Sequence, residues 1–125
     1  STEQVRQLDL FFLVEQIEKN GVESVTADIN SLLKANGYLE LRSPMMLIRV
    51  GNMLATIGRP DDVLPLLEAN VKIFANRSEP FNAIAETYSE RAEMEKAKQY
   101  FEKALEVNPN DDYAKMRLQQ LTKNN

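Results

Sequence analysis

Apolar residues recur at intervals of three and four along most of the chain, and no stretch alternates apolar and polar residues as a half-buried strand does. This periodicity predicts an all-helical protein. Four glycines and five prolines fall mainly where the helical pattern stops. They divide the chain into seven expected helices, at about residues 2–20, 23–35, 44–58, 60 onward, 79–91, 93–107 and 112–122. Pro65 predicts a distorted first turn or a later start for the fourth helix.

A repeat of 34 residues links the middle of the chain to its C-terminal part. After a shift of that length, large apolar residues fall on large ones and small residues fall on small ones. The matched pairs include Leu47 and Phe81, Val50 and Ile84, Leu54 and Tyr88, Leu67 and Phe101, Gly51 and Ala85, and Gly58 and Ala92. Such a repeat is typical of stacked helical hairpins, each of which buries its apolar side against the next.

The stretch 78–111 resembles a tetratricopeptide repeat. The matching positions are Phe81, Ile84, Ala85 and Tyr88 in the first helix, Ala97, Phe101, Ala104 and Leu105 in the second, and the terminating Pro109. Ala92 stands at the turn between the helices, where the family usually has glycine. The resemblance implies an all-α fold, a right-handed α-α superhelix of about three stacked hairpins followed by a C-terminal cap helix.

Within one structural domain, the sequence predicts four segments. Residues 1–41 form a degenerate helical pair that turns at Gly21, and residues 42–77 form a divergent tetratricopeptide-like hairpin. Residues 78–111 form the full repeat, and residues 112–125 form the cap helix and tail. The hairpin at 42–77 lacks the terminal proline and has Asn70 where a small residue is usual.

A second resemblance covers most of the chain. The runs VEQIEKNGVESV, VGNMLATIGRPDDVLPLLEANVKIF and NAIAETYSERAEMEKAKQYFEKALEVNPND are similar to the helical tail of many bacterial serine hydrolases, either β-lactamase-like and penicillin-binding-protein-like enzymes or esterases. The resemblance implies the C-terminal region of an exported, periplasmic enzyme, or else a stand-alone relative in the cytoplasm. The first residues, Ser1-Thr2 without a methionine, are typical of a fragment.

The amino-acid composition excludes most kinds of catalytic and cofactor site. The chain has no cysteine, histidine or tryptophan, which excludes thiolate nucleophiles, Cys/His zinc sites and histidine-containing triads. We therefore expect no enzyme, no metal site and no cofactor. Fifteen basic and nineteen acidic residues give a net charge of −4 without a basic cluster, so we expect no nucleic-acid partner. No apolar run approaches the roughly 20 residues that span a bilayer, so we expect no membrane partner.

One short string has a catalytic precedent. Ser31-Leu32-Leu33-Lys34 is an S-x-x-K sequence, which in penicillin-binding enzymes places an amine one helical turn from a nucleophilic hydroxyl. Those enzymes also need an S-D-N element and a K-T-G strand, and this sequence has neither. The string is therefore interpreted as a surface serine and lysine that flank two core leucines.

The first helices of successive hairpins are expected to line the concave side of the stack. The candidate binding face consists of Met45, Ile48, Asn52, Thr56, Asn82, Glu86, Ser89, Glu90, Tyr113, Met116 and Arg117. Ile48 and Glu79 stand where a clamp for C-terminal carboxylates would need basic residues, and Glu86 and Glu90 would repel an acidic tail. We therefore expect a mixed groove for a peptide or another domain. A solvated face without a ligand is the open alternative.

The first helix offers a second surface because its apolar residues cover more than one stripe. Leu8, Phe11 and Phe12 form the candidate docking patch, which is expected to contact an upstream domain of the same chain or a second copy in a homodimer. Burial beneath the second and third helices is the alternative.

The sequence thus favours a non-catalytic protein-interaction or intramolecular packing module, whose partner is a protein, a peptide or an upstream domain. A stand-alone adaptor and a homo-oligomerisation element remain alternatives. A hydrolase that acts through Ser31 and Lys34 is the alternative from a different class.

Overall fold

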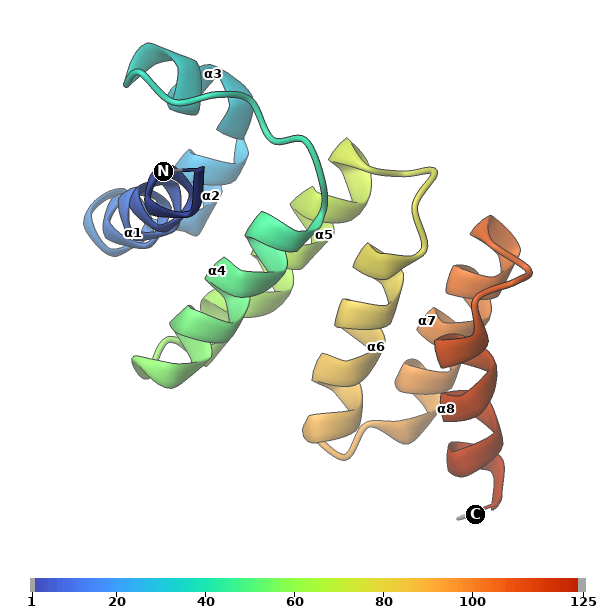
Figure 1. The fold of residues 1–125 in the computed structure, drawn as a ribbon. Helices are drawn as coiled ribbons and strands as arrows, with labels where there is room; N and C mark the ends of the chain where they lie inside the picture. Colours follow the sequence, from blue (N-terminus) through green and yellow to red (C-terminus); the bar gives the residue numbers. More distant parts are fainter. Residues whose placement is uncertain (1, 124–125) are drawn as a thin grey trace. The chain divides into compact units, whose positions relative to one another are not determined.

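The computed structural model describes the backbone of residues 2–123 and the side chains of residues 8–123. Its regular structure over these residues is helical, which confirms the predicted all-α class (Figure 1). The helices are α1 (Thr2–Asn20), α2 (Val22–Thr26), α3 (Ile29–Ala35), α4 (Met45–Thr56), the 3-10 turn η1 (Pro60–Asp62), α5 (Val63–Ile73), α6 (Glu79–Glu90), α7 (Met94–Val107) and α8 (Asp112–Lys123).

The chain folds as two compact units. The first comprises Ser1–Ala69 and the second Asn70–Asn125, so the boundary falls within α5. Consecutive helices pack on one another within each unit, as the sequence predicts for a stack of hairpins. The predicted segment boundaries after residues 41, 77 and 111, their assignment to one structural domain and the handedness of the superhelix stay predictions.

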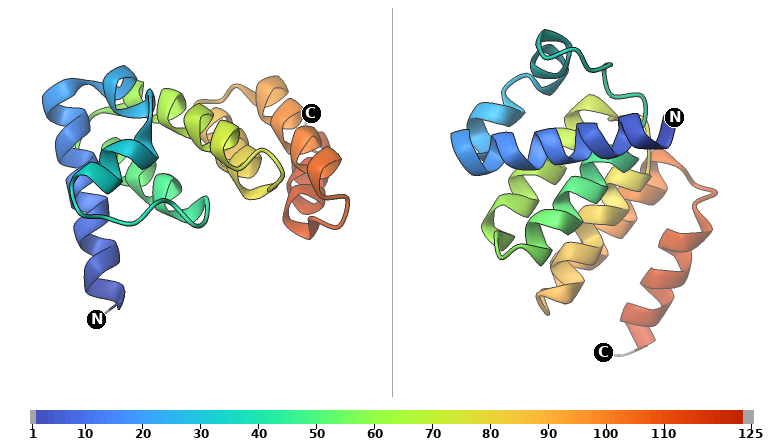
Figure 2. Two further views of the ribbon diagram at one scale, coloured as in Figure 1. Left: turned by 90° about the horizontal axis from the view of Figure 1, so that it is seen from above. Right: turned by 60° about the vertical axis from the view of Figure 1, so that its left-hand side comes forward.

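In the first unit, α1 packs on both α2 and α4, and Figure 2 shows it lying across α4. Its buried stripe consists of Leu13, Val14 and Ile17, spaced so that they share one side of the helix. The helix ends at Gly21, whose φ of 86° is a left-handed conformation that favours glycine. Burial of the stripe at 13, 14 and 17 therefore fixes which side of α1 remains outside.

The single helix predicted at 23–35 is wrong, because the structure divides it into α2 and α3. Asp28 stands between the two with an extended φ of −158°. Its carboxylate accepts hydrogen bonds from the backbone N–H of Ser31 at 3.1 Å and from the Ser31 hydroxyl at 2.7 Å. A side chain that caps a new helix competes with continuation of the old one, and here the cap prevails over the apolar periodicity.

The helices α4 and α5 form the hairpin that the 34-residue repeat predicts. Gly51 lies against α5, and a Cβ atom built on it would be 3.5 Å from Leu67 Cδ2. Gly58 provides the turn with a φ of 84°, and α4 ends two residues before it. The expected late start near Pro65 is confirmed, because a 3-10 turn fills residues 60–62 and the α-helix begins only at Val63.

In the second unit, α6 and α7 form a hairpin, and α8 packs on α7. Ala92 makes the turn with a φ of 60°, a conformation that costs free energy for a residue with a Cβ atom. The core is a cluster of mostly small side chains around one large ring, formed by Ala85, Ala97, Phe101, Ala104, Ala114 and Leu121. Small residues let the three helices approach closely, and Phe101 fills the space between them with no exposed surface.

Candidate functional site

The start of α8 is fixed to α6 by Asp111. One carboxylate oxygen accepts the backbone N–H of Ala114 at 3.0 Å, which caps α8, and the other accepts the side-chain N–H of Asn82 at 2.7 Å. Although partial burial acts in the opposite direction, hydrogen bonds from Ala114, Ser78, Asn82 and Tyr113 lower the pKa of Asp111 below its usual range. The charged form of this carboxylate therefore stabilises the packing of α8.

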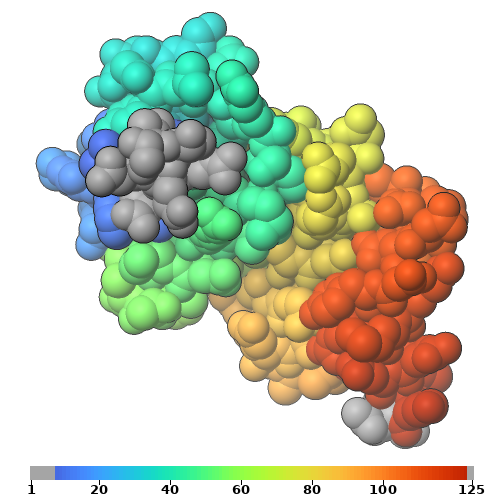
Figure 3. Space-filling view, in the orientation of Figure 1, coloured from blue at the N-terminus to red at the C-terminus, as the bar shows by residue number. Residues whose placement is uncertain are grey.

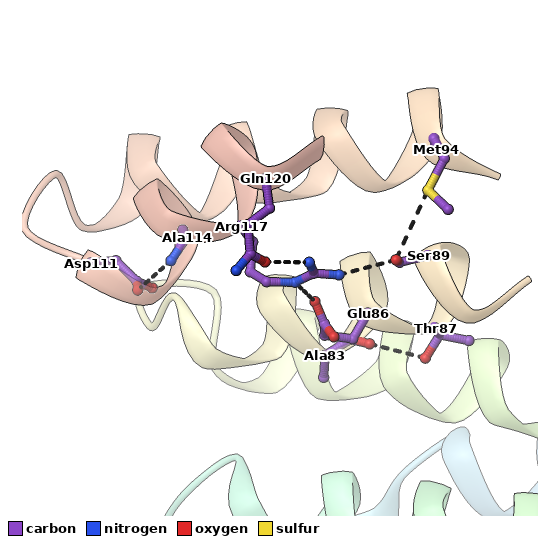
Figure 4. A network of polar contacts seen from close by, with 9 residues as sticks. All are labelled: Ala83, Glu86, Thr87, Ser89, Met94, Asp111, Ala114, Arg117 and Gln120. Carbon is purple, nitrogen blue, oxygen red and sulfur yellow. Dashed lines mark hydrogen bonds and ion pairs between the residues drawn. The ribbon is translucent and has the colours of Figure 1, made fainter. Parts of the chain in front are cut away.

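The middle of α8 is fixed by Arg117, which reaches across to α6 (Figure 4). Its Nε donates to Glu86 Oε1 at 2.6 Å, one terminal nitrogen donates to Ser89 Oγ at 3.1 Å, and the other donates to Gln120 Oε1 at 2.7 Å. The guanidinium also lies 5.6 Å from the centre of the Phe101 ring. The side chains of Arg117 and Glu86 are only 18% and 32% exposed, so water screens this ion pair incompletely.

These contacts show that part of the candidate binding face in the second unit is used for bonds between its own helices. Asn82, Glu86, Ser89 and Arg117 do lie close together, but they bond to one another and to Asp111. The prediction from the sequence placed these residues on one face, but it did not include the ion pair between Arg117 and Glu86 across the helices. Two further members of the network, Asp111 and Gln120, were not among the predicted residues of this face.

The rest of this face stays accessible. Glu90, Tyr113 and Met116 are exposed, the last two to 44% each. The Tyr113 ring packs edge-on against Phe101 with ring centres 6.2 Å apart. Partial burial, followed by the charge of Glu86, raises the pKa of Tyr113, and its hydroxyl is hydrogen-bonded to Glu86 and Arg117 at the edge of the same network. Figure 3 shows α8 on the surface of the second unit in that view.

The part of the candidate face on α4 is the more open one. Met45, Asn52 and Thr56 are exposed and Ile48 is half-buried, while the core side of the same helix is formed by Leu47, Val50, Gly51 and Leu54. The Thr56 hydroxyl donates to the Asn52 carbonyl oxygen at 3.0 Å. The stripe therefore offers two apolar side chains, an amide and a hydroxyl, and the exposed Arg49, four residues after Met45, lies on the same side of the helix.

The candidate docking patch on α1 is divided by the structure. Leu8 and Phe11 are 58% and 54% exposed, so the alternative in which they are buried is wrong. Phe12 is half-buried and packs on Tyr38, with ring centres 4.8 Å apart. Tyr38 follows Gly37, whose left-handed φ of 85° ends α3 and turns the chain back. This ring pair was not predictable from the sequence, because its members are 26 residues apart and belong to different elements.

The S-x-x-K string has no catalytic geometry. The Ser31 hydroxyl donates to Asp28 Oδ2 at 2.7 Å, and the Lys34 ammonium forms an ion pair with Glu40 at 3.2 Å. A lysine that activates a serine must lie within hydrogen-bond reach of its hydroxyl, and here each side chain bonds to a different carboxylate. The arrangement agrees with the interpretation of Ser31 and Lys34 as surface residues.

Among the residues that the structure describes, no group of three or more Asp or Glu side chains is arranged to hold a metal ion. Among the helices described, none combines the length and the apolar character needed to cross a membrane.

Comparison with known protein families gives one match. Residues 78–111, which span α6, α7 and the turns on either side, match the family model described as "Tetratricopeptide repeat". The chain contains a tetratricopeptide repeat. Comparison with curated proteins finds no matching sequence. Tetratricopeptide repeats generally mediate protein binding and are typically non-catalytic, which agrees with the interpretation of the sequence as an interaction module.

Proposed function

We propose that this protein is a non-catalytic module that binds a protein or peptide on the outer faces of its helices. The observation that supports this most directly is the tetratricopeptide repeat at residues 78–111, folded as the α6–α7 hairpin and closed by α8. The contacts of Asp111 and Arg117 hold α8 in one position, so the side chains beside them have a fixed arrangement. Binding to such a surface loses little conformational entropy in the module itself.

The proposed surface has two parts, which are treated separately because they belong to different units. On α4 it consists of Met45, Ile48, Asn52 and Thr56, and on α6 and α8 it consists of Glu90, Tyr113 and Met116. A clamp for a terminal carboxylate needs several basic side chains together, whereas Arg117 is bonded to Glu86 and the α4 part has the single exposed Arg49 beside it. We therefore propose recognition by mixed apolar and hydrogen-bonding contacts and not by a carboxylate clamp.

Selection of a displayed peptide library on the 125-residue chain tests this function. We expect an enriched sequence family whose binding is weakened by Asn52→Arg or by Tyr113→Ala. Lys72→Ala is the matched control, because Lys72 is exposed and lies outside both parts of the surface. Failure to enrich any family, or enriched peptides that bind all these variants equally, would contradict the proposal.

The similarity to the helical tail of bacterial serine hydrolases leads to a finer proposal. The module would then contact the catalytic domain of the same polypeptide, with the exposed Leu8 and Phe11 on α1 as part of the contact surface. Reading the gene upstream of Ser1 tests this directly. A preceding S-x-x-K domain with a K-T-G strand is the expected result, and a start codon immediately before Ser1 would refute it.

A further inference from the structure

The exposed stripe of α1 changes from apolar to acidic along the helix, whereas its buried stripe is apolar throughout. Residues 8, 11, 15 and 18 are all exposed and are spaced by three, four and three positions, so they lie along one side of the helix. Leu8 and Phe11 form its first half, and both are more than half exposed. Glu15 and Glu18 form its second half. The stripe is therefore apolar at one end and acidic at the other.

The surrounding charge has the same sign. Residues 1–69 contain ten acidic and six basic side chains, whereas residues 70–125 contain nine of each, so the whole net charge of −4 belongs to the first unit. Lys19 pairs with Glu15 at 2.6 Å on the exposed surface, where such a pair screens only part of the local field. Glu18, one turn further on than Glu15, extends the acidic end.

From this arrangement we infer that the outer stripe of α1 binds a basic amphipathic helix from a separate protein. Two apolar side chains one turn apart on the partner would cover Leu8 and Phe11, and a lysine or arginine one or two turns along would meet Glu15 and Glu18. The inference rests on the proposed function and specifies the partner for one surface of the module.

Charge also distinguishes this occupant from a second copy of the chain. A second copy would bring another unit of net charge −4 to the patch, and like charges oppose such an approach. A basic helix gains attraction over the same distance and is steered towards the acidic end of the stripe. The pattern thus favours a heterologous partner over a homodimer at α1.

The test uses the full chain and a pair of designed peptides of about 20 residues, long enough to form a helix in isolation. Both present leucines one turn apart, and one continues with arginine where its twin has glutamate. Fluorescence anisotropy should show that the basic peptide binds about tenfold or more tightly than the acidic twin, a preference that shrinks between about 0.1 M and 1 M salt. Equal binding of the twins, or no binding of the basic peptide, would overturn the inference.

Two variants separate the apolar contact from the charge contact. Because Phe11 is 54% exposed, a partner can cover about half of its ring, so Phe11→Ala should weaken the basic peptide about five- to tenfold. Glu18→Lys should reduce the preference between the twins while leaving the apolar contact in place. Ile73→Ala, which removes an apolar side chain 38% exposed at the end of α5, should change neither quantity. Unchanged binding by Phe11→Ala would refute the assignment of the site to α1.

Two further outcomes have distinct meanings. A dimer in sedimentation that disappears in Phe11→Ala would show that a second copy covers the stripe, and it would overturn the inference. Failure of the basic peptide to bind a chain that does bind library peptides through Asn52 or Tyr113 would also overturn the inference, while leaving the proposed function of the module intact.

Discussion

Replacement of Arg117 by alanine removes a side chain that joins α8 to both α6 and α7. The guanidinium donates to Glu86 and Ser89 on α6 and lies over the ring of Phe101 on α7. Alanine and arginine are both good helix formers, so the substitution leaves the intrinsic stability of α8 nearly unchanged. The change in stability therefore reports on the cross-helix contacts.

The expected loss of stability depends on how far the ion pair between Arg117 and Glu86 is shielded from water. Exposed ion pairs contribute about 0–1 kcal/mol, and hydrogen bonds to charged groups that are buried contribute about 1.5–3 kcal/mol. Arg117 and Glu86, at 18% and 32% exposure, lie between these cases, which suggests about 1–1.5 kcal/mol. Loss of the Ser89 bond and of the contact with Phe101 adds about 0.5–1 kcal/mol. We expect a total destabilisation of about 2 kcal/mol.

The assay is urea unfolding followed by far-ultraviolet circular dichroism, with the free energy of unfolding as the readout. Lys115→Ala is the matched control, because Lys115 and Asp112 are exposed and their charges are 4.0 Å apart, and it should change stability by less than about 0.5 kcal/mol. The double variant with Glu86→Ala should show a coupling energy of about 1 kcal/mol. A loss of less than about 0.5 kcal/mol for Arg117→Ala would refute the view that this network holds α8 in place.

Three further predictions concern backbone conformation and pH. Ala92→Gly should raise the free energy of unfolding by about 0.5–1 kcal/mol because glycine tolerates a φ of 60°. Ala55→Gly, in the exposed last turn of α4, should instead lower it by up to about 1 kcal/mol, and equal effects of the two substitutions in thermal melts would contradict this. Gly51→Ala should leave the free energy of unfolding unchanged or raise it by up to about 1 kcal/mol, because the added Cβ would lie at an ordinary 3.5 Å from Leu67. A clear loss of stability in the same melts would show that α4 and α5 pack too closely for alanine. Because the pKa of Asp111 is lowered in the folded chain, this carboxylate takes up its proton in the unfolded chain first as the pH falls. The wild-type protein should therefore lose free energy of unfolding below about pH 4, and Asp111→Asn should lose less of it over the same range. Parallel pH profiles of the two proteins in urea titrations would argue against this.

Several features of the fold were predictable because their signals are local. The 3.6-residue periodicity marks the helices, Pro65 delays the start of α5, and the turn at Ala92 follows from its alignment with Gly58. The repeat at 78–111 was recognisable because its apolar and small residues recur at fixed spacing. Each of these signals lies within a few residues of the feature that it predicts, or within one repeat.

The break between α2 and α3 was not predictable from periodicity alone. Apolar residues continue at helical spacing through 23–35, yet Asp28 caps a new helix by bonding to Ser31. A cap and a continuous helix are both compatible with this sequence, and the balance between them depends on how the two short helices pack. Val25 and Ile29, one on each side of the break, are both buried.

The sequence by itself determined the helical class, the repeat and the residues that belong to one side of each helix, because those properties follow from spacing along the chain. Only the tertiary structure decided which of those residues remain free. Glu86, Ser89 and Arg117 were assigned to a binding face, but they are bonded to one another across α6 and α8. Leu8 and Phe11 remain on the outside because Leu13 and Ile17 turn the opposite side of α1 inward. The physical reason is that pairing between helices depends on their relative rotation, which side-chain packing sets and which no local pattern encodes.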